Sequence, residues 1–272
     1  MKYLGFIKIL LIALSFQACE QSMEHVDDSL EVDFRVCESV PTRSGKMVFD
    51  IGDSIGIFAV KRVDVNKPAL PGSQNNQAHN VKWVKTAEGW RPASAIDKVV
   101  WAQDGTPLDF YAYYPYQEEV KNPESIILAV QKNQIDEQAL VLSDFLRSAN
   151  TQGLTEGVVE LSFSHLFALL DVKLIREGGD IAPDAALAVA DVCTKVSVNL
   201  GTGIQTPMET GRVQLFCTNP STHAYQGILP AQEFVGGTAT FQIDDKGVNY
   251  VYTFKDMTLQ SGSSQKFELN LK

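Results

Sequence analysis

The stretch at residues 159–174, VELSFSHLFALLDVKL, indicates how this chain folds. Its first half alternates, with Val159, Leu161 and Phe163 on one face and polar side chains on the other. This period of two residues is typical of a half-buried β-strand, because successive side chains of a strand point to opposite faces. Beyond His165 the apolar residues fall out of phase with that face. Such a change predicts a bend, a bulge or a strand that passes from one sheet to another.

The same alternation recurs along most of the chain, and helical periodicity is scarce. Turn residues separate the alternating segments, notably Glu88-Gly89, Asp104-Gly105 and residues 244–247. Many short strands without a strand–helix–strand rhythm predict antiparallel β-sandwiches. The predicted strands and hairpins cover residues 31–36, 47–60 (two short strands), 82–91, 101–116, 195–199, 212–217, 240–244, 248–254 and 266–271.

The interval at residues 136–157 has the weakest strand pattern. We interpret it as one helical turn near residues 138–147, followed by a polar stretch at residues 148–153. The length available for folding, about 240 residues, suits one large or two modest domains. The sequence therefore predicts two tandem β-sandwich domains, at residues 31–153 and 154–272.

The first eighteen residues have the features of an export signal. Lys2 and Lys8 give a positive start, and the apolar run that follows is too short to span a membrane. Cys19 comes directly after Ala18, which is the arrangement of a bacterial lipoprotein whose cysteine thiol carries the lipid. We predict a signal peptide at residues 1–18, a lipid on Cys19 and a polar tether at residues 19–30.

The net negative charge of the chain limits which partners it can bind. Removing residues 1–18, which contain two lysines and no acidic residue, changes the formal net charge from −10 to −12. A surface that negative argues against binding of nucleic acid or of anionic lipid headgroups.

Residue types that carry chemistry are present but do not form a recognisable site. The four histidines are scattered, and no nucleophile elbow, phosphate loop or dinucleotide fingerprint occurs. We predict no enzymatic activity, no cofactor and no metal, and we interpret His165 as a hydrogen-bonded structural residue. Beyond Cys19, three cysteines remain, so a Cys193–Cys217 bridge and free thiols are both open.

The aromatic residues between 101 and 116 are the best candidates for a ligand site. Trp101, Tyr111 and Tyr113 could form a platform on which sugars stack. The alternative is that aromatic residues on alternating faces fill a core on one side and cover loops on the other.

The chain resembles the fimbrillin family of Bacteroidales, and the resemblance covers nearly all of it beyond the signal. It rests on five blocks in the same order, combined with a lipoprotein start. These blocks are FDIGDSIGIFA at residues 49–59, LDFYAYYPY at 108–116, LSFSHL at 161–166, GILPAQ at 227–232 and LQSG at 259–262.

The resemblance implies two transthyretin-like β-sandwich domains, exported as an outer-membrane lipoprotein that serves as stalk, anchor or tip of a surface fimbrium. In polymerising members an arginine-specific protease removes the first strand, and the open groove takes a strand from a neighbouring subunit. The removable strand would here be residues 31–36, and the candidate cleavage site is Arg43, with Arg35 as the weaker alternative. The inward residues of that strand would be Val32, Phe34 and Val36.

The last strand has the alternating pattern of a donor strand, with Phe267, Leu269 and Leu271 on one side. The alternative is an ordinary last strand paired within its own domain. The partners expected are other fimbrillin subunits and the outer membrane through the lipid. A different function, still open from the sequence, is a surface lipoprotein that binds a glycan or a host protein as an adhesin.

Overall fold

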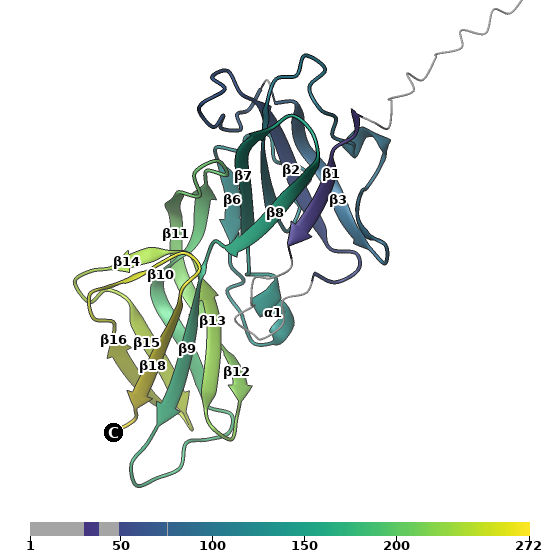
Figure 1. Ribbon diagram of the computed structural model, residues 1–272. Helices are drawn as coiled ribbons and strands as arrows, with labels where there is room; N and C mark the ends of the chain where they lie inside the picture. Colours follow the sequence, from purple (N-terminus) through teal and green to yellow (C-terminus); the bar gives the residue numbers. More distant parts are fainter. Residues whose placement is uncertain (1–29, 38–48, 75) are drawn as a thin grey trace, which may run out of the picture.

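A computed structural model describes residues 30–37, 49–74 and 76–272 of the chain (Figure 1). Strands dominate this part of the chain, as the sequence predicts. Within the described residues, helical structure is limited to the single-turn α1 at Glu137–Val141, a 3-10 turn, η2, at Ala95–Asp97, and Leu30 at the border of the described part. The predicted signal, the lipidation site, the tether up to residue 29 and Arg43 lie outside the described residues.

The N-terminal half forms a seven-stranded sheet in the order β1-β8-β7-β5-β2-β3-β4. Most neighbours in it are antiparallel, but β1 pairs with β8 in parallel. Its strands are β1 (Asp33–Cys37), β8 (Val158–His165), β7 (Leu146–Leu154), β5 (Leu108–Tyr114), β2 (Ser54–Lys61), β3 (Ala78–Thr86) and β4 (Gly89–Pro92).

This sheet curls until its first strand meets its far side. Phe34 of β1 packs edge-on against Trp83 of β3, with ring centroids 4.8 Å apart. Four strands separate β1 from β3, so a flat sheet would hold them about 24 Å apart at about 4.8 Å per strand. The curled sheet therefore encloses a core of its own, and Phe34 lies inside it.

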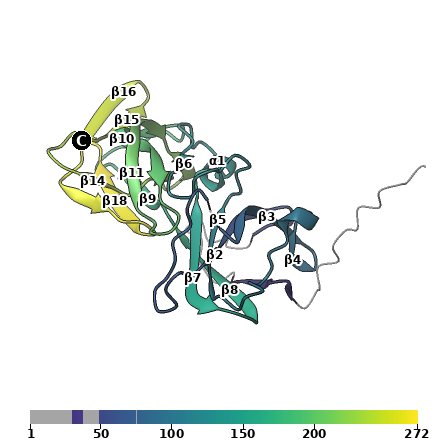
Figure 2. The same cartoon turned by 90° about the horizontal axis from the view of Figure 1, so that it is seen from above.

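The C-terminal half, which lies beside the N-terminal half in Figure 2, contains two larger sheets and one small one. The first has the order β11-β10-β15-β16, the second β12-β13-β9-β18, and β14 pairs with β17. Their strands are β9 (Ala168–Ile175), β10 (Ala186–Val198), β11 (Gln205–Gln214), β12 (Phe216–Asn219), β13 (Ala224–Leu229), β14 (Gln232–Phe234), β15 (Thr240–Asp245), β16 (Val248–Thr253), β17 (Met257–Leu259) and β18 (Ser264–Asn270).

The change of phase after His165 is the point at which the chain leaves the N-terminal sheet. Strand β8 pairs with β7 and β1, whereas β9 pairs with β13 and β18. Of the alternatives that the change of phase left open, the structure has a change of sheet, with a bend at residues 166–167 between the two strands. The predicted division after residue 153 falls one residue before the end of β7, which pairs with β8 in the same sheet. In addition, β6 (Ile126–Ala129), which precedes β7 in the chain, pairs with β10 of the C-terminal half.

Two local predictions are wrong. The polar stretch at residues 148–153 lies in β7, because its pairing with β5 satisfies the backbone despite weak local strand propensity. The predicted hairpin at residues 101–116 forms only its second strand, β5. Residues 99–101 instead bond to the residues just before β1.

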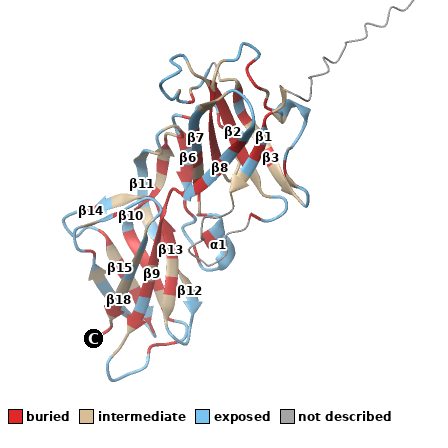
Figure 3. Cartoon of the chain, in the orientation of Figure 1, coloured by how far each residue is buried: buried red, intermediate tan, exposed pale blue. Residues whose placement is uncertain are grey.

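Buried residues form two clusters, visible as red segments in Figure 3. One fills the curled N-terminal sheet. The other fills the C-terminal sheets and extends onto the opposite face of β2 and β5 through Phe58, Val60, Tyr111 and Tyr113. The outer face of the N-terminal sheet thus shares a core with the C-terminal half, which couples the two halves by apolar burial.

A buried ion pair holds the loop after β2 against β5 and β7. Asp109 is fully buried, and the guanidinium of Arg62 donates to both of its carboxylate oxygens at 2.8–3.1 Å. The backbone N–H groups of Ala69 and Gly153 also donate to this carboxylate. Together these bonds satisfy the carboxylate and offset the cost of its burial.

Replacing Asp109 with Ala should destabilise the fold by about 3–5 kcal/mol, because Arg62 is then left as a buried cation without its partner. Urea unfolding of the wild-type chain and the variant would measure this difference. The control is Asp104→Ala, which removes the exposed ion pair with Lys61 at 3.2 Å and should change stability little. Equal effects of the two substitutions would contradict the assignment.

Replacing Phe34 with Asp should cost several kcal/mol, on the order of 3 or more, because an unpaired carboxylate then enters the N-terminal core. Thermal and urea unfolding would report the loss. Arg35→Asp, one residue further along β1 and exposed, serves as the matched control and should have a much smaller effect. An unchanged melting temperature for the Phe34 variant would mean that this strand is not packed.

Candidate subunit-assembly site

The segment at residues 30–37, which contains the first strand, pairs with two other parts of the chain. Strand β1 itself pairs in parallel with β8 over all five of its residues. Just before β1, Val32 N–H donates to the carbonyl of Val99, and Trp101 N–H donates to the carbonyl of Leu30, both at 2.8 Å. Removing the segment would therefore leave two rows of backbone groups without partners, on β8 and at residues 99–101.

The two faces of this strand differ as the alternation predicts. Val32 and Phe34 are 1% and 5% exposed, and Val36 is half-buried against the same core. On the outer face, Arg35 forms an ion pair with Glu160 at 3.1 Å, with both side chains more than half exposed. An exposed pair of this kind contributes little stability, so the apolar face and the backbone pairing hold β1 in place.

Of the two candidate cleavage residues, Arg35 and Arg43, only Arg35 lies within this strand. Arg35 lies within β1, where its backbone is part of the pairing with Glu160 of β8. A protease must hold the substrate backbone in extended form, so an arginine in a paired strand is a poor target. Arg43 lies outside the described residues.

The candidate donor strand is docked in its own half of the molecule. Strand β18 pairs in parallel with β9 and forms the edge of its sheet. Leu269 and Leu271 are 8% and 2% exposed, and the half-buried Phe267 packs against Phe241 and Phe254 at 5.0 and 5.5 Å. In this arrangement the strand is part of the C-terminal core, which fits the alternative of an ordinary last strand.

The proposed aromatic platform is not at the surface. Trp101, Tyr111 and Tyr113 are 7%, 0% and 2% exposed, because alternate side chains of this region enter the two cores. The hydroxyl of Tyr111 donates to the carbonyl of Ala69, and that of Tyr113 donates to the Asn80 side chain. Burial raises the pKa of Tyr111 to about 12. This burial fits the alternative of core filling, and the stacking platform stays a prediction.

The other candidate reactive side chains are His165 and three cysteines. The buried His165 bonds through Nδ1 to Asp144 at 2.7 Å, so the hydrogen bond expected for this residue is present. Cys37, Cys193 and Cys217 are free, so the bridge left open by the sequence is absent. Within the described residues, no cluster of potential metal ligands occurs, and no helix is long and apolar enough to cross a membrane.

Sequence reasoning missed that residues 30–32, just before β1, pair with residues 99–101. The isolated bridge between Glu31 and Val100 joins residues far apart in the chain, and alternation does not indicate partners. A signal was present in Val99, Val100 and Trp101, an apolar run just before the Asp104-Gly105 turn.

The chain is similar to proteins of known fold and to a curated protein. The curated protein "Putative fimbrium subunit Fim1C" of Bacteroides uniformis is 26% identical over 258 residues, which cover 89% of this chain and 80% of that protein. A crystal structure of "a putative cell adhesion protein" from Bacteroides uniformis superposes with a TM-score of 0.66 at 17% identity, covering 89% of this chain and 93% of the other. A "fimbrial protein" from Bacteroides ovatus gives a TM-score of 0.54 at 16% identity, covering 90% of this chain and 50% of the other.

These solved structures support the fold described above. The family comparison goes further, because the model of one family, described as "Fimbrillin-like", matches residues 42–272. That match includes all five blocks quoted from the sequence and most of both halves of the structure. The chain therefore belongs to the fimbrillin-like family.

Proposed function

We propose that this protein is a subunit or accessory protein of a surface fimbrium, held at the outer membrane by a lipid on Cys19. The proposal rests on family membership and on the similarity to a protein named as a fimbrium subunit. Under it, the partners are other fimbrillin subunits. Assembly proceeds by strand exchange after the chain is cut at Arg43, which releases β1.

The observation that carries this proposal is that residues 30–37, which contain β1, pair with two segments from elsewhere in the chain, β8 and residues 99–101. A released strand would expose backbone donors and acceptors beside the apolar site that Phe34 now fills. A strand from a second subunit would satisfy both, through main-chain hydrogen bonds and alternate side chains. The groove already fits β1, so it would also fit an incoming strand with the same alternation of apolar and polar residues.

The candidate donor is β18, whose alternation resembles that of β1. Its release would cost the burial of Leu269 and Leu271, and insertion into a groove would recover a similar burial. Exchange of one buried strand for another is therefore close to balanced in apolar area. Cleavage, which removes the competing β1, would then set the direction of assembly.

Replacing Cys19 with Ala should move the protein from the membrane to the soluble fraction and abolish fatty-acid labelling, because no other residue would carry the anchor. Fractionation and labelling of cells would measure both. Cys37→Ala, at the end of β1, is the matched control and should leave both unchanged. Persistent labelling of the Cys19 variant would reject the lipid assignment.

Treatment with an arginine-specific protease at low dose should cut first after Arg43, giving a new N-terminus at Ser44. The cut protein should associate with itself, and deleting residues 267–272 should weaken that association. Sedimentation and N-terminal sequencing would follow the two events, with Arg43→Gln as the uncut control. A cut protein that stays monomeric would indicate an anchor or a tip, and an uncut Arg43 would leave the surface-adhesin reading.

A further inference from the structure

Strand β16 is a free edge without the protection that the other free edges carry. In natural sheets, short strands, charged residues, prolines or bulges at the edges prevent pairing with another chain. In the described part of the chain, β4, β6, β12, β14 and β17 have only three or four residues. The longer β11 contains a proline, charges and register shifts, and β1 and β18 carry charges.

By contrast, β16 has the sequence VNYVYT, with six residues and neither a charge nor a proline. Its pairing with β15 runs without a register shift. β-branched and aromatic residues have high strand propensity, so the sequence favours addition of a further strand. Val251 is 63% exposed at the centre of this edge.

The turn before β16 determines which of its backbone N–H and C=O groups point outward. A two-residue turn, Lys246-Gly247 with both φ angles positive, joins β15 to β16. The residues that flank such a turn form a hydrogen-bonded pair, so alternate residues of β16 bond inward to β15. The N–H and C=O groups of Asn249, Val251 and Thr253 then point away from the sheet, toward a partner.

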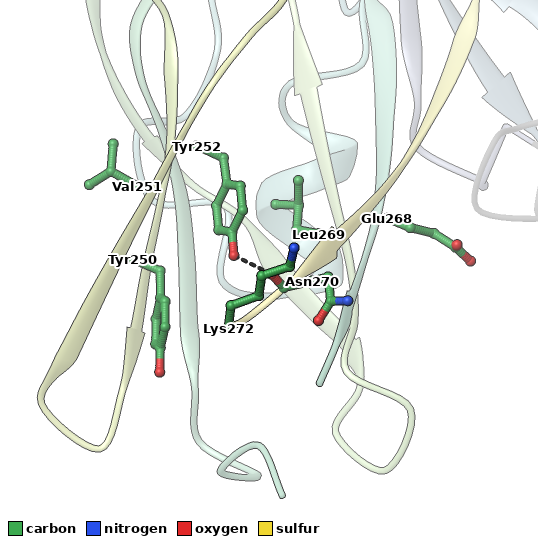
Figure 4. A pocket seen from close by; sticks show the side chains of 7 residues that line it. All are labelled: Tyr250, Val251, Tyr252, Glu268, Leu269, Asn270 and Lys272. Carbon is green, nitrogen blue, oxygen red and sulfur yellow. Dashed lines mark hydrogen bonds between the residues drawn. The ribbon is translucent and has the colours of Figure 1, made fainter. Parts of the chain in front are cut away.

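Contacts from behind hold β16 in place. Arg176 donates to the hydroxyl of Tyr250 at 2.8 Å and pairs with the buried Asp245 at 2.7 Å. The hydroxyl of Tyr252 donates to the carbonyl of Asn270 on β18, across a groove of about 420 Å³ (Figure 4). The edge is thus presented in a fixed conformation, which lowers the ordering cost of binding.

We propose that β16 is a self-association surface, which pairs antiparallel with β16 of a second copy about a two-fold axis at Val251. In this register Val251 faces its own copy, and Asn249 faces Thr253 of the partner. The outward groups of these three residues would form about six main-chain hydrogen bonds. The partner's β15–β16 hairpin would continue the sheet with its inner face on the same side.

A second copy fits this edge because the edge is complementary to itself. The two-fold axis that places Val251 opposite Val251 also brings the turn that carries Lys246 of one copy toward the end of β16 that precedes Asp256 in the other, at both ends of the contact. Opposite charges there favour this register, whereas a shift toward the turn would lose bonds at Thr253. The contact lies far from β1 in the fold, so it is a lateral contact that does not depend on strand exchange (Figure 1).

A cysteine at the axis tests this geometry directly. Directly opposed residues of a hydrogen-bonded antiparallel pair have Cα atoms about 5.5 Å apart, within the range that a disulfide spans. Full chain carrying Val251→Cys, in mild detergent, should form at least tenfold more covalent dimer on gentle oxidation than Val235→Cys. Val235 has the same exposure, 63%, and lies outside the strands, so the two variants share the background from native thiols.

A charge at the same position tests the association itself. Val251→Lys places two like charges face to face and should raise the dimer dissociation constant at least tenfold by sedimentation, with Val235→Lys unchanged. Circular dichroism would verify that both variants fold. Cross-linking of Val251→Cys no greater than that of Val235→Cys, or an unchanged dissociation constant for Val251→Lys, would overturn the proposal. Neither result would bear on the proposed cleavage at Arg43, which is tested separately.

Discussion

The N-terminal half depends on how one short segment satisfies its backbone hydrogen bonds. Strand β1 pairs with β8, and residues 30–32 before it pair with residues 99–101; neither partner is near this segment in the chain. Phe34 reaches Trp83 because these pairings bring the first strand over the curled sheet. The closed core and the candidate assembly groove are thus consequences of one pairing arrangement.

The edge strands of the sheets differ in how far they are packed against the rest of the molecule. The first strand is docked against β8 with its apolar face in the N-terminal core, β18 is docked against β9 by buried leucines, and β16 presents an uncharged strand to solvent. These differences have different physical consequences. A docked strand must be removed before another can replace it, whereas an open edge can accept a partner without loss of any native contact.

The two halves are not independent in packing, although each has its own sheets. β6 precedes β7 in the chain yet pairs with β10, and Tyr111 and Tyr113 project from the N-terminal sheet into the C-terminal core. A disturbance at either face of β5 can therefore reach both cores. Phe110 on one face and Tyr111 on the other illustrate how a single alternating strand supplies both.

The sequence by itself determined the all-β class, the inward faces of residues 31–36 and 266–271, the turn at residues 244–247 and the break in strand phase after His165. Each of these follows from local periodicity or turn chemistry, which neighbouring residues decide. The tertiary structure decided which strands pair, since backbone hydrogen bonds carry no residue identity. It turned the break after His165 into a change of sheets, placed the weakly patterned residues 148–153 in a strand, paired Trp101 with the residues just before β1, and buried Tyr111 and Tyr113. Pairing and burial of this kind depend on segments distant in the chain, so no local pattern contains them.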